Sequence, residues 1–159
     1  MIMEKDIINI LIVDDEKYEG ILIEKCVNWE SEGFHIIGNV QCAENALKLM
    51  EKQVPDIVYT DINMPRIDGL ELSRRIRDTY PAVRIVIVTG YREFEYAREA
   101  IHIGVEEFLL KPIQSDELLA AAMKLREQIL KKREQQSKDV ENLSGPLSGT
   151  ASKDSYRIH

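Results

Sequence analysis

The sequence predicts a three-layer α/β/α fold in which a parallel sheet of five strands lies between helices. Two observations support this fold class. Short apolar runs rich in β-branched residues recur along the chain, and such runs are typical of strands that are buried on both faces. Stretches with the apolar spacing of helices separate these runs, and strands that alternate with helices pair in parallel through right-handed crossovers.

Five segments are expected to form the strands. They span residues 7–13, 34–40, 56–60, 83–88 and 107–110. The segment 34–40 mixes polar with apolar residues, whereas the other segments are mainly apolar. A mixed strand is typical of the edge of a sheet, so this segment is expected at an edge.

Five further segments have the spacing of amphipathic helices. They begin near Glu16, Ala43, Leu70 and Phe94, and immediately after Ser115. Asp68 is expected to cap the third of these helices, because an aspartate before the first turn accepts hydrogen bonds from free backbone amides.

The apolar residues of two helices predict which face turns to the core. In the first helix, the residues available for burial are Ile21, Leu22 and Val27. In the fourth helix, the spacing of Phe94, Ala97 and Ile101 assigns these three side chains to the core. Tyr91 and Tyr96 are then left as candidates for an exposed contact with a partner.

Composition and charge limit the organisation and the function class. With 159 residues, of which 44% are apolar, the chain is expected to form one domain over residues 1–133 and a polar, disordered tail over residues 134–159. A net charge of -7 argues against binding of DNA or RNA by this chain alone. The two cysteines are too few for a disulfide framework, and the absence of a long apolar run predicts a cytoplasmic protein without a membrane span.

Polar residues stand at the ends of four expected strands. Asp14 and Asp15 follow the first strand, Asp61 the third, Thr89 the fourth and Lys111 the fifth. Because the carboxyl ends of parallel strands meet at one edge of a sheet, these residues are expected to lie together. Packed carboxylates repel one another, and a hard cation such as Mg²⁺ offsets that repulsion with oxygen ligands. A carboxylate beside Mg²⁺ can act as a nucleophile toward phosphorus.

Each of these residues also has a purely structural explanation when it is taken alone. Asp14 and Asp15 could cap the first helix, and Asp61 could be an ordinary loop acid. Lys111 alone would be explained as a surface lysine. The convergence of all of them on one edge favours the functional interpretation.

These motifs resemble, in order and spacing, the receiver domain of two-component response regulators over residues 7–130. The resemblance rests on Asp14-Asp15, the segment Asp61-Ile-Asn-Met-Pro-Arg-Ile-Asp-Gly69, Thr89-Gly90 and Lys111-Pro112. It implies the flavodoxin-like (βα)5 topology with strand order 2-1-3-4-5. It also implies a phosphoprotein of a signalling pathway, which assists its own phosphotransfer and dephosphorylation but is not an enzyme with an independent substrate.

The resemblance implies a role for each acidic residue of the site. Asp61 would accept the phosphoryl group from a sensor histidine kinase and form an aspartyl phosphate. Mg²⁺, or Mn²⁺ in its place, would be held by Asp15, Asp61 and the backbone carbonyl of Asn63. Asp14 would hold the ion through water.

The resemblance also implies roles on the neighbouring strands. Thr89 and Lys111 would contact the phosphoryl group, and the Lys111-Pro112 peptide bond would be cis. Phe108 occupies the place of the family's switch aromatic, although a phenylalanine in a strand is more simply explained as a core residue.

A closer likeness concerns the output of the signal. Residues 29–38 and 89–104 are similar to receivers that precede an AraC-type helix-turn-helix domain, which implies control of transcription. The residues after Leu130 are too few for such a domain, so the chain is expected to be either part of a longer regulator or a stand-alone receiver that acts by protein-protein interaction. The last two helices and the strand between them would form the output face and a surface for a homodimer.

Two other function classes fit part of the pattern. The first is a phosphatase with an aspartyl nucleophile, but such an enzyme needs an acid two residues after Asp61, and Asn63 stands there. The second is an interaction module that does not use phosphorylation, and the presence of all five polar residues of the site counts against it.

Overall fold

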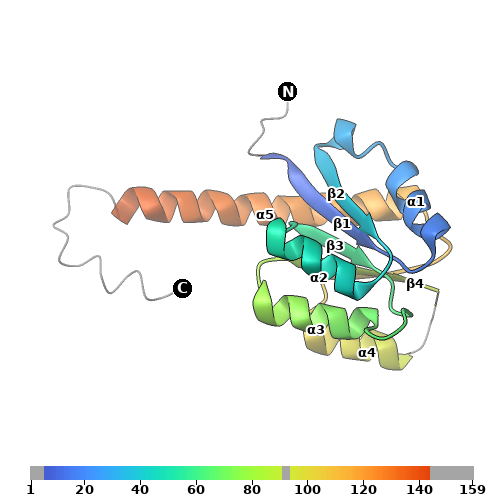
Figure 1. The fold of residues 1–159 in the computed structure, drawn as a ribbon. Helices are drawn as coiled ribbons and strands as arrows, with labels where there is room; N and C mark the ends of the chain where they lie inside the picture. The colour runs from blue at the N-terminus through green and yellow to red at the C-terminus, as the bar shows by residue number, and fades with distance from the viewer. Residues whose placement is uncertain (1–5, 91–93, 144–159) are drawn as a thin grey trace. The chain divides into compact units, whose positions relative to one another are not determined.

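The computed structural model describes residues 6–90 and 94–143, with the side chains of residues 141–143 left out. It contains one sheet of five parallel strands in the order β2-β1-β3-β4-β5, which confirms the expected fold class and topology (Figure 1). The strands are β1 Ile8–Val13, β2 Phe34–Val40, β3 Ile57–Thr60, β4 Arg84–Thr89 and β5 Glu107–Leu110. Among the described residues, no helix is both long enough and apolar enough to cross a membrane.

The helices alternate with the strands along the chain. They are α1 Lys17–Lys25, α2 Ala43–Lys52, α3 Gly69–Thr79, α4 Phe94–Ile103 and α5 Ser115–Leu143, and a short 3₁₀ helix, η2, spans Glu30–Glu32. Asp68 caps α3 as expected, because its carboxylate accepts a hydrogen bond of 2.8 Å from the amide of Glu71.

The chain divides into two compact units, residues 1–126 and 127–159. In the second unit α5 continues to Leu143, so residues 134–143, which are expected to begin a disordered tail, are helical. Ion pairs one turn apart stabilise this part of the helix, Lys131 with Glu127 at 3.3 Å and Lys138 with Glu134 at 3.4 Å. The rest of the expected tail lies outside the described residues, and the domain boundary near residue 133 stays a prediction.

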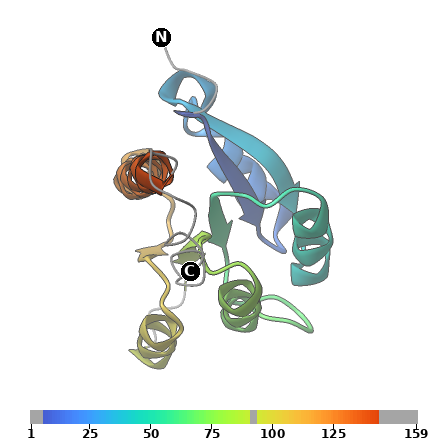
Figure 2. The same ribbon diagram turned by 90° about the vertical axis from the view of Figure 1, so that its left-hand side faces the viewer.

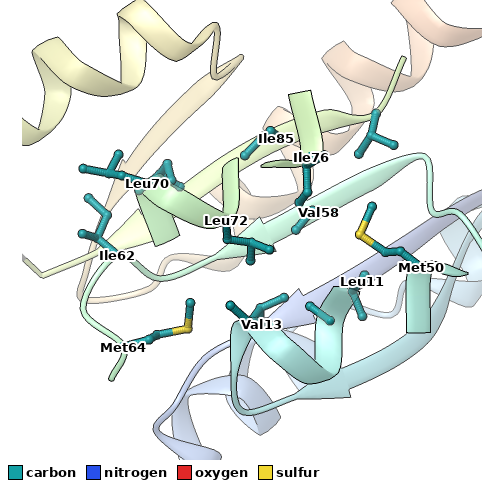
Figure 3. Packing of buried hydrophobic residues seen from close by; sticks show 14 of the residues in the cluster. Leu11, Val13, Met50, Val58, Ile62, Met64, Leu70, Leu72, Ile76 and Ile85 are labelled. Atoms are coloured by element: carbon teal, nitrogen blue, oxygen red, sulfur yellow. The ribbon is translucent and has the colours of Figure 1, made fainter. Parts of the chain in front are cut away.

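The first unit has an apolar core on each face of the sheet. The core under α2, α3 and α4 includes Leu11, Val58 and Ile85 from the strands and Met50, Leu72 and Ala100 from the helices (Figure 3). Because successive side chains of a strand point to opposite faces, Tyr59 lies on the other face from Val58. There it reaches α5, and the strands separate α2 and α3 from the first turns of α5 (Figure 2).

The expected inner face of α1 is only partly confirmed, because Val27 is buried as expected but lies after the end of the helix. The helix ends at Lys25, and the side chains of Ile21 and Leu22 are exposed, contrary to expectation. Ile23 is buried instead. Three consecutive apolar residues fit a helical stripe in more than one way, so their spacing alone does not decide which of them faces the sheet.

The expected inner face of α4 is wrong. Phe94 and Ile101 are 71% and 77% exposed, whereas Ala100 is buried and Tyr96 and Ile103 pack against the core under α2, α3 and α4. Both sets of residues have helical spacing. The observed face places the small side chain of Ala100 against the core, where a helix can approach most closely. Tyr91 lies outside the described residues.

Candidate functional site

Backbone hydrogen bonds bring the ends of the strands together at one edge of the sheet. The amide of Asp61 donates to the carbonyl of Val13 at 3.0 Å, so the pairing of β3 with β1 continues one residue past β3. The amide of Lys111 likewise donates to the carbonyl of Thr89 at 2.9 Å, which continues the pairing of β5 with β4. The residues that follow these strands therefore start from adjacent positions.

Lys111 joins two of the three acids. Its Nζ lies 3.1 Å from Asp14 Oδ2 and 3.1 Å from Asp61 Oδ2. Both carboxylates are almost completely buried, with Asp14 1% and Asp61 5% exposed, whereas Asp15 is exposed. The ammonium is therefore the nearest counter-charge of a pair of buried carboxylates.

Backbone amides fix the second oxygen of each buried carboxylate. Asp14 Oδ1 accepts a hydrogen bond of 2.9 Å from the amide of Glu16, and Asp61 Oδ1 accepts one of 2.7 Å from the amide of Ile62. In both residues Oδ2 is left to face Lys111. The amides thus orient the two carboxylates before any ligand arrives.

The electrostatic balance of the site opposes the ionised form of Asp14. Burial raises the pKa of Asp14 from 3.8 to about 6, and the hydrogen bond from Glu16 and the charge of Lys111 only partly oppose this rise. Burial lowers the pKa of Lys111, but the carboxylates of Asp14 and Asp61 outweigh burial and raise it overall. At neutral pH the site therefore holds a carboxylate whose charge is only partly compensated.

Replacement of Asp14 by asparagine is expected to stabilise the metal-free protein at high pH. The folded state holds the Asp14 proton more tightly than the unfolded state, because the pKa of Asp14 is higher in the folded state. The contribution of Asp14 to stability is therefore complete below pH 3.8 and is lost as the pH rises through about 6. Asp14→Asn should raise the free energy of unfolding by about 1–3 kcal/mol at about pH 8 and much less at about pH 4.

Urea denaturation in the presence of EDTA at both pH values measures this difference. Asp15→Asn is the matched control, because it removes a neighbouring acid whose side chain is exposed. An equal effect of the two substitutions at both pH values would contradict the assigned electrostatic balance.

The three acids form a group that fits a divalent cation. Asp14, Asp15 and Asp61 each offer a carboxylate oxygen, and these oxygens all lie within 4.8 Å of one another. Hard cations such as Mg²⁺ prefer oxygen ligands of this kind. The raised pKa of Asp14 fits the same conclusion, because the site needs more positive charge than Lys111 provides.

The other residues expected at the site lie in different surroundings. Thr89 is fully buried at the end of β4, and Asn63 is exposed in the loop that follows Asp61. Phe108 is partly buried and packs against the core under α2, α3 and α4. The Lys111-Pro112 peptide bond is cis. The roles of these residues in binding or switching stay predictions.

Gly69 contributes to the site in a way that the sequence does not reveal. Its amide donates to the carbonyl of Ile62 at 2.8 Å, and a Cβ atom built on Gly69 would lie 1.9 Å from the carbonyl oxygen of Asp61. The start of α3 therefore packs directly on the peptide bond that follows Asp61. The sequence predicts that Asp68 caps the helix and indicates no role for Gly69, and a glycine at the first position of the helix is the one visible signal of the close approach.

A second unforeseen feature lies in the same loop. Arg66 has a φ angle of 69°, in the left-handed region that residues other than glycine seldom adopt. Its Nε lies 2.6 Å from Glu44 Oε2 in the first turn of α2. This ion pair accompanies an unusual backbone conformation between Asp61 and α3.

Comparison with known protein families identifies most of the first unit. Residues 10–123 match the family described as the response regulator receiver domain. The uncharacterized transcriptional regulatory protein YesN of Bacillus subtilis is 37% identical over 112 residues, which cover 70% of this chain and 30% of that protein. Protein CcdB of Bacillus subtilis is 30% identical over 116 residues, which cover 73% of this chain and 95% of that protein.

Solved structures show the same likeness. The structure of the REC domain of AraT, a response regulator from Geobacillus stearothermophilus, has a TM-score of 0.74 and 31% identity, and the match covers 80% of this chain and 98% of that one. The chain spans about a third to a half of the length of the first transcriptional regulators that it matches, with shares of 30%, 48% and 32%.

Proposed function

Because this chain belongs to the response regulator receiver domain family, we propose that it accepts a phosphoryl group on Asp61 from a sensor histidine kinase. The observation that carries the proposal is the contact of Lys111 Nζ with both Asp14 and Asp61, which groups an ammonium with buried carboxylates. Phosphoryl transfer depends on positioned charges more than on covalent chemistry by the protein, and this group supplies such charges.

In the proposed transfer, Asp61 Oδ2 attacks phosphorus. Oδ1 is engaged by the amide of Ile62, whereas Oδ2 lies on the side of Lys111. The bond between phosphorus and the imidazole nitrogen of the donor breaks, and its electron pair stays with that nitrogen. Lys111 and the hydroxyl of Thr89 would stabilise the phosphoryl oxygens once they arrive.

We propose that the acids hold Mg²⁺, which Mn²⁺ can replace. Asp15, Asp61 and the backbone carbonyl of Asn63 would hold the ion, and Asp14 would hold it through water. When bound, the ion supplies positive charge that offsets the charge of the transferred group. The oxygen donors of Asp14, Asp15 and Asp61 within 4.8 Å of one another support this assignment.

Labelling by a small phosphodonor tests the proposal. The protein is incubated with acetyl phosphate in Mg²⁺ or in EDTA, and intact-protein mass spectrometry follows the mass gain of one phosphoryl group. We expect labelling to be about tenfold or more faster in Mg²⁺, because the ion neutralises developing charge. Equal rates in both buffers would contradict the metal assignment, and no labelling in either would contradict the phosphoacceptor.

We propose that the output is control of transcription. The first curated relatives are named as transcriptional regulators and are longer than this chain, which supports an effector domain outside residues 1–159. An AraC-type effector is the expected kind. Residues 1–159 would bind no DNA themselves, because their net charge is -7, and a gel shift at physiological salt tests this.

A stand-alone receiver is the second candidate, and the match that covers 95% of protein CcdB favours it. Such a receiver would act by protein-protein interaction, with a homodimer through α4, β5 and α5 as one form. Sedimentation velocity with and without acetyl phosphate distinguishes a phosphorylation-dependent dimer from a monomer.

We propose no independent enzymatic turnover. Asn63 stands two residues after Asp61, and an amide cannot protonate a leaving group as a general acid does. Sustained hydrolysis of a generic phosphate ester such as p-nitrophenyl phosphate would contradict this.

A further inference from the structure

Tyr59 links the strand of the phosphoacceptor to α5. It lies two residues before Asp61, and its hydroxyl donates a hydrogen bond of 2.6 Å to the backbone carbonyl of Leu118. Its side chain is fully buried. A buried hydroxyl has no water to replace a lost partner, so this bond holds the first turns of α5 to β3.

A second contact ties the segment before α5 to the same strand. Lys111 precedes α5 by four residues, and its Nζ lies 3.1 Å from Asp61 Oδ2. Residues 111–118 are therefore attached to β3 at both ends, through Asp61 and through Tyr59.

The fluorescent side chain of Trp29 lies against Tyr59 and can report on its position. Trp29 is the only tryptophan of the chain, and its ring contacts that of Tyr59 edge to face, with centroids 5.9 Å apart and an angle of 72°. Trp29 Nε1 donates to the carbonyl of Ile23 in α1 at 3.0 Å. The indole is thus held by a hydrogen bond on one side and lies against Tyr59 on the other, so a displacement of Tyr59 would change its surroundings.

We propose that Tyr59 is a positioning residue that couples phosphorylation of Asp61 to the first turns of α5. The inference rests on the proposed function of Asp61. Phosphorylation would transfer Lys111 Nζ from a carboxylate oxygen to a phosphoryl oxygen and so change one end of the attached segment. Because the hydrogen bond from Tyr59 ties Leu118 to β3, a displacement that starts at Lys111 would be carried through residues 112–118 to the first turns of α5 and to the side chain of Tyr59. Without the hydroxyl, α5 is no longer tied to β3 at this point, and the response of its first turns would be lost.

Hydrogen exchange tests the coupling with Tyr59→Phe, which removes only the hydroxyl. In the unchanged protein, phosphorylation by acetyl phosphate should alter the exchange of amides in residues 115–125 by about fivefold or more, as expected for a coupled pair of sites. In Tyr59→Phe the same comparison should give less than about twofold. Tyr80→Phe is the matched control, because Tyr80 packs against the core on the opposite face of the sheet, and it should behave like the unchanged protein.

The fluorescence of Trp29 provides a second readout of the same difference. Its change on phosphorylation should be seen in the unchanged protein and in Tyr80→Phe, and should be largely lost in Tyr59→Phe. A purely structural role of Tyr59 would alter exchange equally in both phosphorylation states and leave the difference between them intact, which would overturn the inference. An unchanged protein without any response in α5 would overturn it as well.

The same samples separate this inference from the proposed function. The mass of each protein is measured before exchange, so that the extent of its phosphorylation is known independently. Labelling of both proteins with an equal response in α5 contradicts only the role of Tyr59. Failure of both proteins to label contradicts the phosphoacceptor, and the inference falls with it.

Discussion

Asp61→Asn is expected to abolish labelling by acetyl phosphate, with a rate at least about a hundredfold lower than that of the unchanged protein, because the amide is a far weaker nucleophile than the carboxylate. Asparagine has the shape of aspartate and keeps a side-chain oxygen that can accept the hydrogen bond from the amide of Ile62. The fold is therefore expected to survive. Intact-protein mass spectrometry in Mg²⁺ measures the loss.

Asp68→Asn is the matched control for this substitution. It changes an acid of the same loop, and asparagine caps a helix about as well as aspartate. Labelling of Asp68→Asn should equal that of the unchanged protein. If Asp61→Asn were labelled at the same rate as its control, the phosphoryl group would be carried by another residue.

Gly69→Ala is expected to destabilise the domain by about 2–4 kcal/mol, a large effect for the addition of one methyl group. The added Cβ would lie 1.9 Å from the carbonyl oxygen of Asp61 and 2.9 Å from the Cα of Ile62. Both are backbone atoms, so no side chain can move to relieve the overlap. The loop that carries Asp61 and Asn63 must shift, and labelling should fall together with stability.

Gly90→Ala is the matched control, because it adds a methyl group after the adjacent strand β4, where a Cβ would meet no atom of the described residues within 4 Å apart from its chain neighbours. Urea denaturation gives the free energy of unfolding of both variants. Equal stability of Gly69→Ala and Gly90→Ala would show that the close approach of α3 to Asp61 can relax without cost.

The arrangement of strands and the meeting of the polar residues could be predicted from the sequence. Both depend on features that sequence records directly, namely the alternation of strands with helices and the positions at which strands end. Asp14, Asp61 and Lys111 each follow a strand. Backbone hydrogen bonds between neighbouring strands continue past the ends of those strands and place these residues side by side. The topology needed a family resemblance as well, because alternation alone does not order the strands.

The inner faces of two helices could not be predicted in this way. In α4, Phe94 with Ile101 and Tyr96 with Ile103 both have a spacing of seven residues, which is two turns of a helix. Only packing against the neighbouring elements decides between two such stripes. The large apolar side chains suggest one face, and the structure buries the face that carries Ala100.

The contacts of Gly69 and Tyr59 could not be predicted for a related reason. Both depend on distances between atoms of different elements, which the spacing of residues along the chain does not contain. A tyrosine in a buried strand signals that its hydroxyl needs a partner, but the sequence does not name Leu118 as that partner. The contact of Gly69 with the carbonyl of Asp61 likewise depends on how closely α3 approaches β3.

The exposed stripe of α4 has a consequence for the local stability of the domain. Ala100 is the only fully buried residue of this helix, and Tyr96 and Ile103 are only partly buried where they pack against the core, so detachment of α4 would expose a limited apolar area. The ion pair between Arg74 of α3 and Glu99 is partly exposed and adds little to the attachment. Regions with few buried apolar contacts open at a small fraction of the global free energy of unfolding. Helix α4 is therefore an element whose position the chain can change at a small free-energy cost, while the sheet and the charged site stay folded.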